Sequence, residues 1–342
     1  MIINIQSCKM KRSLLLFFFG LFACTFPTIA ISTPAPTSTP LAVSTPTATP
    51  QPTLPPGSVK NPLLLALAPS THPADDVITA ADGLATKLEA LTGYHFVAVA
   101  PPSEAGLVKL LNAGNVNIAA LSPLAYMLAH DNGARAALAS TRKGKAFYGA
   151  QFIARASDNY DVFFDPIRAE NTADAPEALS QFKDKKPCWS DAASSSGYVI
   201  PLGVLNQAKV QIRPGAFVEG QPTVVRAVYA GGICDFGATY IDARENPALE
   251  ADYPDVKDKV DVIWRIPAII PYDLIVFSAN VTPDVERSLL RAFVDIMNTA
   301  DGKALVQKIY GMDELQIVQD AVYEDFRSNV KDSGVNLNEL MK

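Results

Sequence analysis

The chain has few of the residues that most hydrolytic and metal-dependent enzymes need. It contains three histidines, His72, His95 and His130, and four cysteines among 342 residues. HExxH, Walker and GxGxxG motifs are absent, and so is the GxSxG pattern of a nucleophile elbow. His95 opens a predicted strand and His130 ends a predicted helix, so neither is placed to activate a serine. We therefore expect no enzymatic activity, no resident cofactor and no metal site.

Basic residues and long apolar runs are also scarce. The run from Leu14 to Ala23 has about ten residues and is too short to span a membrane. Lys9, Lys11 and Arg12 precede it, as in a signal peptide, and MKRSLLLFFF makes Met10 a candidate start. Removing these three charges leaves 26 basic against 35 acidic residues, a net charge of −9. Non-specific nucleic-acid binding, which needs a basic face, is therefore excluded.

The residues after this run predict an exported and tethered protein. Leu21 to Cys24 resemble a lipobox, in which the cysteine becomes the lipidated N-terminus, and cleavage after Ala30 is the alternative. Residues 25–58 are rich in Thr, Pro, Ser and Ala and carry no charge, a composition typical of an extended spacer. We predict a signal peptide at 1–24 and a tether at 25–58. The protein is then a lipoprotein on the outer face of the cytoplasmic membrane, or a free periplasmic protein if cleavage follows Ala30.

Strands and helices alternate along the rest of the chain. Three buried strands between residues 62 and 121 are separated by amphipathic helices, and the same order repeats after residue 187. This order predicts parallel α/β sheets, and chain crossings are expected around 155–161 and 269–273. We predict an α/β fold of two lobes, each a doubly wound and mostly parallel sheet, with a cleft between them. The expected division is residues 59–155 with 268–342 for lobe 1 and 156–267 for lobe 2.

Cys188 and Cys234 are the cysteines that remain in the mature domain. Each begins a predicted strand, with a helix, a strand and a helix between them. In a doubly wound sheet the first and third strands of such a unit can be neighbours, and export permits disulfides. We favour a Cys188–Cys234 disulfide over the alternative of two buried free thiols.

The stretch DAASSSGYVIPLG, Asp191 to Gly203, places three serines before an apolar run that fits a helix. A helix N-terminus has free backbone N–H groups and a positive dipole end, so Ser194, Ser195 and Ser196 mark a candidate anion site. A simple helix cap is the alternative. Pro201 removes one helical hydrogen bond, which predicts an irregular first turn or a later helix start.

Several segments follow one another in the order of a known family. They are PLLLALAPSTHP, NVNIAALSPLAYMLAH, FYGAQFIARAS, DAASSSGYVIPLGVL, GGICDFGATYIDA and VIWRIPAIIPYDLIVF. Together, over about residues 60–330, they resemble the phosphate, phosphite and phosphonate-type substrate-binding proteins of ABC importers. The resemblance implies a type 2 periplasmic-binding-protein fold that closes on its ligand by a hinge, and delivery to a permease with an ATPase.

The resemblance also implies which residues meet the ligand. Ser194, Ser195 and Ser196 take the places of residues that hold phosphonate or phosphate oxygens. Relatives that hold an amino-substituted phosphonate carry a His-acidic pair where this chain has Gln221 and Pro222, so an ammonium group finds no carboxylate there. Further ligand-binding candidates, each with a packing or capping role as the alternative, are Thr71, His72, Ser122, Tyr126, Tyr148, Gln221, Tyr240 and Asp242.

We therefore predict the extracytoplasmic solute-binding component of an ABC importer, a monomer that binds a small phosphorus oxyanion and performs no chemistry. Its partners are the small anionic ligand, the permease and ATPase complex, and the membrane through the lipid anchor. The alternatives are the same fold binding a sulfonate or a thiamine-precursor type solute, or a membrane-tethered ligand sensor.

Overall fold

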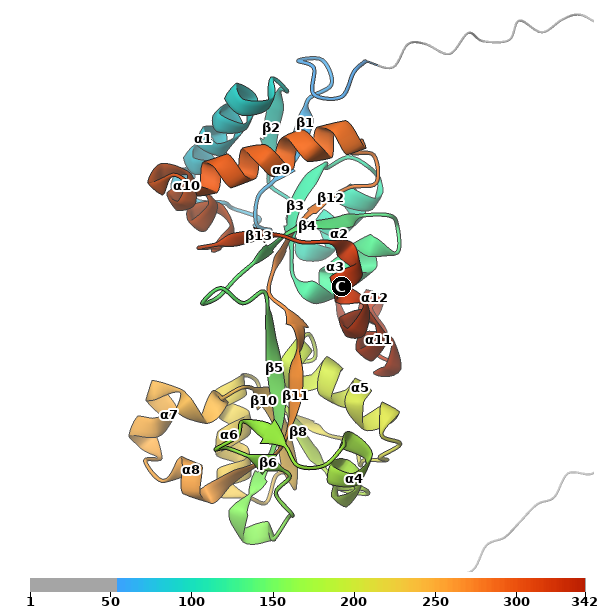
Figure 1. The fold of residues 1–342 in the computed structure, drawn as a ribbon, viewed down its shortest axis with the longest axis vertical. Helices are drawn as coiled ribbons and strands as arrows, with labels where there is room; N and C mark the ends of the chain where they lie inside the picture. The colour runs from blue at the N-terminus through green and yellow to red at the C-terminus, as the bar shows by residue number, and fades with distance from the viewer. Residues whose placement is uncertain (1–53, 342) are drawn as a thin grey trace, which may run out of the picture. The chain divides into compact units, whose positions relative to one another are not determined.

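The computed structural model describes residues 54–341 (Figure 1). The predicted signal peptide, the lipobox at Cys24 and almost all of the tether lie outside the described residues. Within the described part, no helix is both long enough and apolar enough to cross a membrane.

The first sheet has six strands and combines parallel with antiparallel pairs. β1 pairs in parallel with β2 and β3, whereas β12 is antiparallel to β3 and β4, and β13 is antiparallel to β4. The order across the sheet is β13 (Leu315–Ile317), β4 (Arg135–Ser140), β12 (Leu274–Phe277), β3 (Ile118–Leu121), β1 (Leu63–Ala66) and β2 (Phe96–Val99).

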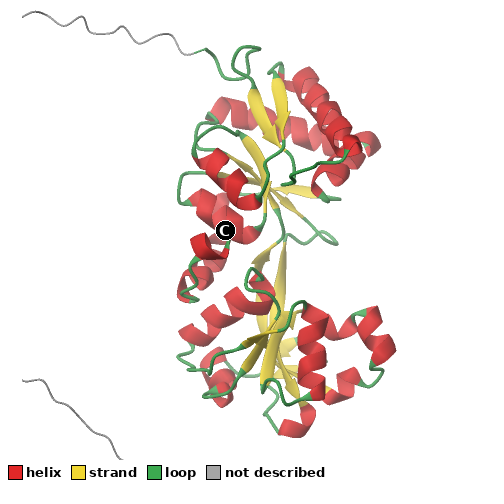
Figure 2. Cartoon of the chain, turned by 180° about the vertical axis from the view of Figure 1, so that it is seen from behind, coloured by secondary structure: helices red, strands yellow, loops and turns green. Residues whose placement is uncertain are grey.

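Helices cover both faces of this sheet (Figure 2). One face buries Leu65 and Ile118 against the amphipathic helices α1 (Asp75–Thr92), α9 (Pro283–Met297) and α10 (Ala300–Tyr310). The opposite face buries Ala66 and Ala119 against α2 (Glu104–Asn112) and α3 (Pro123–His130). Successive strand residues thus enter different cores, as the two-residue period of a strand requires. We call this sheet with its helices the first lobe.

The second sheet has five strands and is also mixed. β8 pairs in parallel with β9 and β10, and β5 runs antiparallel to both β10 and β11. The order is β11 (Val260–Pro271), β5 (Phe147–Arg155), β10 (Phe236–Tyr240), β8 (Pro187–Trp189) and β9 (Ala216–Phe217). A separate two-stranded sheet is formed by β6 (Phe164–Asp165) and β7 (Glu170–Asn171).

Two apolar cores flank the second sheet, which with its helices forms the second lobe. Phe152 and Trp189 pack in one core with α4 (Ala175–Leu179) and α5 (Ile200–Gln207). Ile153 and Cys188 pack in the other with α6 (Gln221–Ala230), α7 (Pro247–Asp252) and α8 (Val256–Lys259). The predicted α/β fold of two lobes is thereby confirmed, with sheets that are mixed because the strands beside the chain crossings run antiparallel to their neighbours.

The chain passes between the lobes at positions that differ partly from those expected. β5 already belongs to the second sheet, so the first crossing lies at residues 141–146 and the expectation of a crossing at 155–161 was wrong. The reason is that the apolar run of β5 pairs on both sides as a central strand. The return crossing joins β11 to β12 at Tyr272 and Asp273, as expected. The lobe boundaries expected at residues 155/156 and 267/268 therefore do not coincide with the two sheets, because β5 and the last residues of β11 belong to the second sheet.

A third connection comes from the C-terminal helix α11 (Glu324–Asp332). Its Phe326 and Val330 lie in the α5 core of the second lobe, although the preceding strand β13 belongs to the first. Asn206 of α5 donates to the Asp332 carbonyl at 2.9 Å. The last helix, α12 (Leu337–Leu340), contacts α3 in the first lobe. The C-terminal segment therefore contacts both lobes, which the alternation of strands and helices did not predict.

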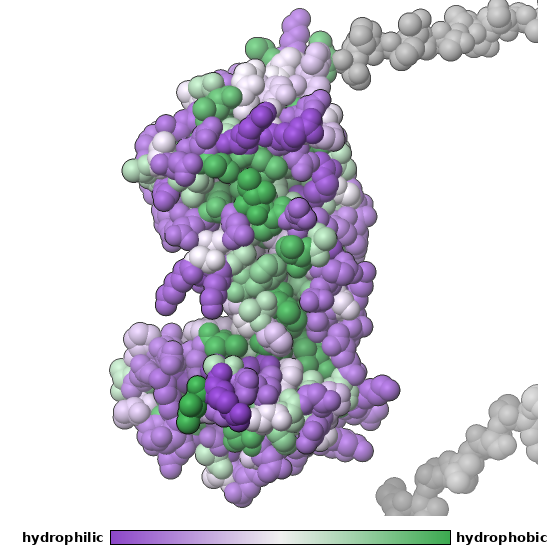
Figure 3. Space-filling view, in the orientation of Figure 1, coloured by the Kyte–Doolittle hydropathy of each residue, from purple (hydrophilic) through white to green (hydrophobic). Residues whose placement is uncertain are grey.

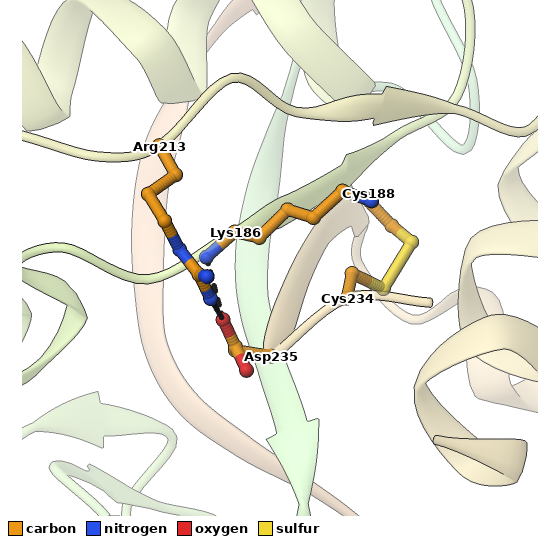
Figure 4. The surroundings of a disulfide bond; sticks show 5 residues. All are labelled: Lys186, Cys188, Arg213, Cys234 and Asp235. Atoms are coloured by element: carbon orange, nitrogen blue, oxygen red, sulfur yellow. Dashed lines mark hydrogen bonds and ion pairs between the residues drawn. A yellow bond between two sulfur atoms is a disulfide. The ribbon is translucent and has the colours of Figure 1, made fainter. Parts of the chain in front are cut away.

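The predicted disulfide joins Cys188 and Cys234, with a Cα–Cα distance of 5.5 Å (Figure 4). Cys188 is the middle residue of β8, and its partner lies just before the neighbouring parallel strand β10. Figure 4 also shows Arg213 paired with Asp235 beside the bond, at 2.6 Å. The adjacency of the first and third strands, on which the prediction depended, is therefore present.

Candidate functional site

A cavity of about 440 Å³ lies between the two lobes, within the size range of small-ligand sites. We call it the interlobe cavity. The second lobe contributes Tyr148, Ala193, Ser194, Ser195, Ser196, Gln221, Tyr240, Ile241 and Pro271. The first lobe and the connections contribute Ser122, Pro123, Leu124, Ser140, Arg142, Tyr272, Asp273 and Gly311. Its walls are thus rich in hydroxyl groups and contain one cation and one carboxylate.

The three serines open an irregular helical turn, Ser194–Val199, which we call the serine turn. It is a π-type turn in which the Val199 N–H donates to the Ser194 carbonyl at 3.0 Å, and α5 begins at Ile200. Pro201 has no N–H to donate to the Gly197 carbonyl, so that carbonyl accepts from the Ser190 N–H at 3.2 Å instead. The irregular first turn expected from the proline is confirmed, and it fixes the serine turn to the end of β8.

Backbone donors at the start of the serine turn are left without protein acceptors. The N–H groups of Ser195 and Ser196 have no hydrogen-bond acceptor among residues 54–341. Gly197 donates its own N–H to the Ser194 hydroxyl oxygen at 3.0 Å. Free N–H groups at the positive end of a helix attract an anion or an anionic oxygen.

Gln221, the first residue of α6, organises the serine hydroxyls. Its side-chain Nε2 lies within hydrogen-bond distance of the hydroxyls of Ser190, Ser194 and Ser196, at 3.2, 3.0 and 3.3 Å. Its Oε1 accepts from the Tyr240 N–H at 3.0 Å, which fixes the orientation of the amide. Nε2 has two hydrogens and cannot accept, so the serine oxygens share these two hydrogens as acceptors and keep their own protons to donate elsewhere.

The approach of Gln221 and Ser190 to the serine turn requires a glycine at position 197. A Cβ placed on Gly197 would lie 2.0 Å from the Ser190 hydroxyl oxygen and 2.8 Å from Gln221 Nε2. Both distances are far below any van der Waals contact. The glycine in SSSGY therefore serves the packing of the hydroxyl cluster.

Two tyrosines extend the site towards the other lobe. Burial raises the pKa of Tyr148, and a hydrogen bond with Ser196 opposes that shift. The Tyr148 ring stacks on Tyr272, with ring centroids 4.9 Å apart and planes inclined by 24°. Tyr272 belongs to the connection between β11 and β12, so this stack joins the serine turn to a crossing between the lobes.

Arg142 and Asp273 are the charged residues of the interlobe cavity. The Arg142 guanidinium carbon lies 4.8 Å from the centre of the Tyr272 ring. Burial raises the pKa of Asp273, the nearby charge of Glu104 adds to that shift, and Arg142 opposes it. The Asp273 side chain is nevertheless open to the cavity, so its charge can meet a ligand.

Seven of the eleven predicted ligand-binding residues line the interlobe cavity: Ser122, Tyr148, Ser194, Ser195, Ser196, Gln221 and Tyr240. Ser122 caps α3, accepting from the Ala125 N–H at 3.4 Å, while its own N–H donates to Glu104 at 2.9 Å. The geometry therefore gathers these seven side chains, and their contact with a ligand stays a prediction.

The structure places the other four elsewhere. Tyr126 is fully buried between His130 and Tyr323, with both ring centroids 5.7 Å away, because α3 turns this side chain into the core. Thr71 and His72 are exposed in the loop before α1, and the Thr71 hydroxyl lies 3.1 Å from His72 Nδ1. None of these three lines the interlobe cavity.

Asp242 is occupied by protein partners. It pairs with Arg244 at 2.7 Å and accepts from Gln151 at 2.8 Å. Burial alone would raise the pKa of Asp242, but the hydrogen bonds and charge of Arg244, with the Gln151 hydrogen bond, hold that pKa below its ordinary value. This carboxylate organises the end of β10 and does not line the cavity.

Sequence reasoning missed Ser140, Arg142, Tyr272 and Asp273, which all line the interlobe cavity. They lie at or between strand ends where the chain leaves one lobe for the other. The segment IIPYD was interpreted only as a crossing, yet residues of a crossing border the cleft between two lobes. Across residues 54–341, no group of three His, Cys, Asp or Glu side chains is placed to hold a metal ion.

Two α/β lobes joined by strand crossings around a polar cavity define the class of two-lobed solute-binding proteins. Residues 66–323 match the family described as ABC transporter, phosphonate, periplasmic substrate-binding protein, and the chain belongs to this family. Membership implies an extracytoplasmic location and a role in ABC import of phosphonate or phosphate-type solutes.

Individual relatives agree with this assignment. The chain is 27% identical to the phosphate-import protein PhnD of Mycolicibacterium smegmatis over 253 residues, which cover 69% of this chain and 72% of that protein. Two structures of XAC2383 from Xanthomonas citri, one bound to chloride ion and one to ATP, match with TM-scores of 0.57 and 0.58. They cover 79% and 82% of this chain and 98% and 99% of their own, at 16% and 15% identity, and so support the fold alone.

Proposed function

We propose that the chain is the solute-binding component of an ABC importer that binds a small phosphorus oxyanion, namely a phosphonate, phosphite or phosphate, at the serine turn. The two lobes close on the anion, and a permease with its ATPase receives it. The protein acts as a monomer and changes no covalent bond in its ligand.

The observation that carries this proposal is that the serine hydroxyls accept hydrogen bonds from the protein and so have protons free to donate. Ser194 Oγ accepts from both the Gly197 N–H and Gln221 Nε2, so both of its acceptor positions are used and its proton is free to be donated. Together with the N–H groups of Ser195 and Ser196, the cluster offers several donors and no carboxylate. Hydrogen bonds to a charged acceptor contribute about 1.5 to 3 kcal/mol each. Such a set suits a tetrahedral oxyanion with several equivalent oxygens.

A thermal-shift screen of the purified mature chain tests this function. The panel is phosphate, phosphite, methylphosphonate, 2-aminoethylphosphonate, sulfate and taurine, since a ligand bound only by the native state raises the unfolding midpoint. We expect a phosphorus oxyanion to give the largest shift. Ser194→Ala and Ser196→Ala should each weaken its binding by roughly tenfold to a hundredfold, because each removes one donor to a charged acceptor.

The matched control is Ser157→Ala, which removes an exposed hydroxyl outside the cavity and should leave the shift unchanged. A shift with taurine or sulfate alone would replace the proposal with a sulfonate or sulfate binder. No shift with any compound, in protein shown to be free of ligand, would contradict the proposed ligand class.

Asp273→Asn should act in opposite directions on two kinds of phosphonate. At pH 7 the ionised carboxylate repels an anion in the same cavity, so the variant should bind methylphosphonate several-fold more tightly. An ammonium group is attracted by the same carboxylate, so 2-aminoethylphosphonate should bind more weakly. Isothermal titration calorimetry with both compounds decides this, and equal effects on both would show that Asp273 does not face the ligand.

The same residue gives a pH dependence of stability whose sign follows from its raised pKa. Its contribution to the stability of the free protein is fully present below the ordinary pKa of about 4 and is lost as pH rises through the higher folded-state value. The Asp273→Asn variant has no carboxyl group to ionise at this position, so it does not lose this stability as the pH rises. The free energy of unfolding of the variant should therefore match the wild type near pH 4 and exceed it at pH 7, by less than about 1 kcal/mol because the cavity is open to water.

We also propose that the mature chain is anchored to the membrane through a lipid on Cys24, with residues 25–58 as the tether. The support is the lipobox-like LFAC and the uncharged Thr/Pro-rich segment after it. The intact mass of the protein extracted from membranes distinguishes this anchor from cleavage after Ala30.

A further inference from the structure

We propose that Arg142 is a second anion-binding residue of the interlobe cavity and that Lys143 and Lys145 beside it draw the anion towards the cavity. This inference rests on the proposed function and names a side chain that meets the oxyanion in addition to the serine turn. We call Arg142–Lys145 the basic hairpin.

The basic hairpin is a tight two-residue turn at the first crossing between the lobes. Arg142 and Lys145 exchange both backbone hydrogen bonds, at 2.9 and 3.1 Å. Lys143 and Gly144 between them have φ values of 52° and 71°, as the favoured two-residue hairpin turn requires. In Figure 1 the segment between β4 and β5 projects as a loop beside the interlobe region, and Figure 3 shows hydrophilic side chains projecting there. The turn thus places Arg142 in the cavity lining and leaves Lys143 and Lys145 exposed beside it.

These cations have no carboxylate partner, in a chain that is acidic overall. Among residues 54–341, nine of the eleven arginines form ion pairs, and Arg142 and Arg291 are the two that do not. Lys143 and Lys145 likewise have no acidic group within 4 Å in the described part. Arg291 is exposed on α9, whereas Arg142 lines the interlobe cavity. Among the residues that the structure describes, Arg142 is therefore the arginine available to a ligand there.

A series of aromatic contacts leads from Arg142 towards the serine turn. The guanidinium lies over the Tyr272 ring, Tyr272 stacks on Tyr148, and Tyr148 lines the interlobe cavity together with Ser196. Stacking on an aromatic ring orients a guanidinium while leaving its N–H groups free for an oxyanion. The hydroxyl donors and the arginine are thus held on one aromatic wall of the same cavity.

The charge balance at the cavity favours an oxyanion over a neutral solute. Asp273 is the carboxylate that faces the cavity, Glu104 lies near it, and Arg142 opposes the rise in the pKa of Asp273. Arg142 is the cation of the cavity lining, and the exposed Lys143 and Lys145 beside it add two further positive charges. Because the serine turn contributes further positive dipole ends, the cavity as a whole attracts anions.

Equilibrium binding tests Arg142. Methylphosphonate and inorganic phosphate are titrated into the mature chain by calorimetry, first with the wild type and then with Arg142→Gln. We expect whichever of the two the wild type binds to bind about tenfold to a hundredfold more weakly to the variant. Arg142→Lys, which keeps the charge without the planar fork, should recover part of the loss. Arg291→Gln, the other unpaired arginine, should bind as the wild type does.

Association kinetics test the lysines. In stopped-flow measurements, Lys143→Gln with Lys145→Gln should slow association about threefold at low salt and leave the dissociation rate unchanged. The difference should vanish near 0.5 M salt, where exposed charges are screened. Lys60→Gln with Lys209→Gln removes two lysines that lie outside the cavity lining and should leave association unaltered.

The possible outcomes distinguish a failure of this inference from a failure of the proposed function. If the wild type binds none of the phosphorus oxyanions of the thermal-shift panel, the proposed function fails and this inference fails with it. If the wild type binds and Arg142→Gln binds equally well, with an unchanged unfolding midpoint, the serine turn stands and the role of Arg142 is overturned. If Arg142→Gln binds more weakly but Arg142→Lys recovers nothing and both variants unfold at lower temperature, Arg142 supports the fold and does not contact the ligand.

Discussion

Gln221→Glu is expected to abolish useful binding of methylphosphonate, with an affinity loss of about a thousandfold or about 4 kcal/mol. The hydroxyls of Ser190, Ser194 and Ser196 share the two amide hydrogens as acceptors, and Ser194 and Ser196, which line the cavity, keep their protons for a ligand. A carboxylate in the same place has no hydrogens to donate, so it takes those protons as an acceptor. The donors are then turned away from the ligand, and a negative charge is added a few ångströms from the bound anion.

Isothermal titration calorimetry at pH 7 measures the loss of affinity for methylphosphonate, and the pH dependence of that affinity is a second measurement. As pH falls through the pKa of the introduced carboxyl, protonation removes the charge and returns one hydrogen-bond donor, so part of the affinity should return. Gln211→Glu is the matched control, because it adds the same charge at an exposed position outside the cavity. An affinity within threefold of the wild type for Gln221→Glu would mean that the hydroxyls of the serine turn do not hold the anion.

The dependence on Gln221 also shows where sequence reasoning reaches its limit. The serines and the glycine are local, and Pro201 predicted the irregular turn because a missing N–H has a local consequence. The amide that organises the hydroxyls comes from a residue 25 to 31 positions away along the chain. Its orientation is fixed in turn by the Tyr240 N–H. Only the packing of α6 beside β10 and β8 brings these groups together, and no short motif encodes that.

The fold itself was predictable to the extent that it depends on periodicity. An amphipathic helix such as α1 has apolar residues that recur on one face, and a buried strand such as β1 is a continuous apolar run. β4, with RAALAS, was missed because its small residues give neither pattern clearly. β9 covers only Ala216–Phe217, because Pro214 before it cannot donate to a neighbouring strand. The packing of α11 on α5 depends on tertiary contacts that the alternation of elements does not contain.

Removing the disulfide should lower the free energy of unfolding by about 4 kcal/mol. Cys188 and Cys234 are 46 residues apart, and in the chain-entropy account the closed loop restricts the unfolded chain by that amount. The comparison is between the wild type and the double variant Cys188→Ala, Cys234→Ala in urea denaturation under oxidising conditions. A reductant should lower the wild-type midpoint towards that of the variant and leave the variant itself unchanged, which makes the variant its own control.

Removal of the disulfide should also weaken ligand binding, because both of the segments that it joins continue into the binding site. Cys188 lies in β8, which continues into Ser190 and the serine turn, while Cys234 precedes β10, whose last residue Tyr240 fixes the Gln221 amide. β8 and β10 are joined directly by only two residue pairs, so the covalent bond is a large part of what holds them in register. The double variant should therefore bind methylphosphonate more weakly at temperatures well below its unfolding midpoint. If stability falls by 4 kcal/mol while affinity stays unchanged, strand pairing and packing alone are sufficient to hold the serine turn against α6. A fall in stability below about 1 kcal/mol would contradict the loop-closure argument.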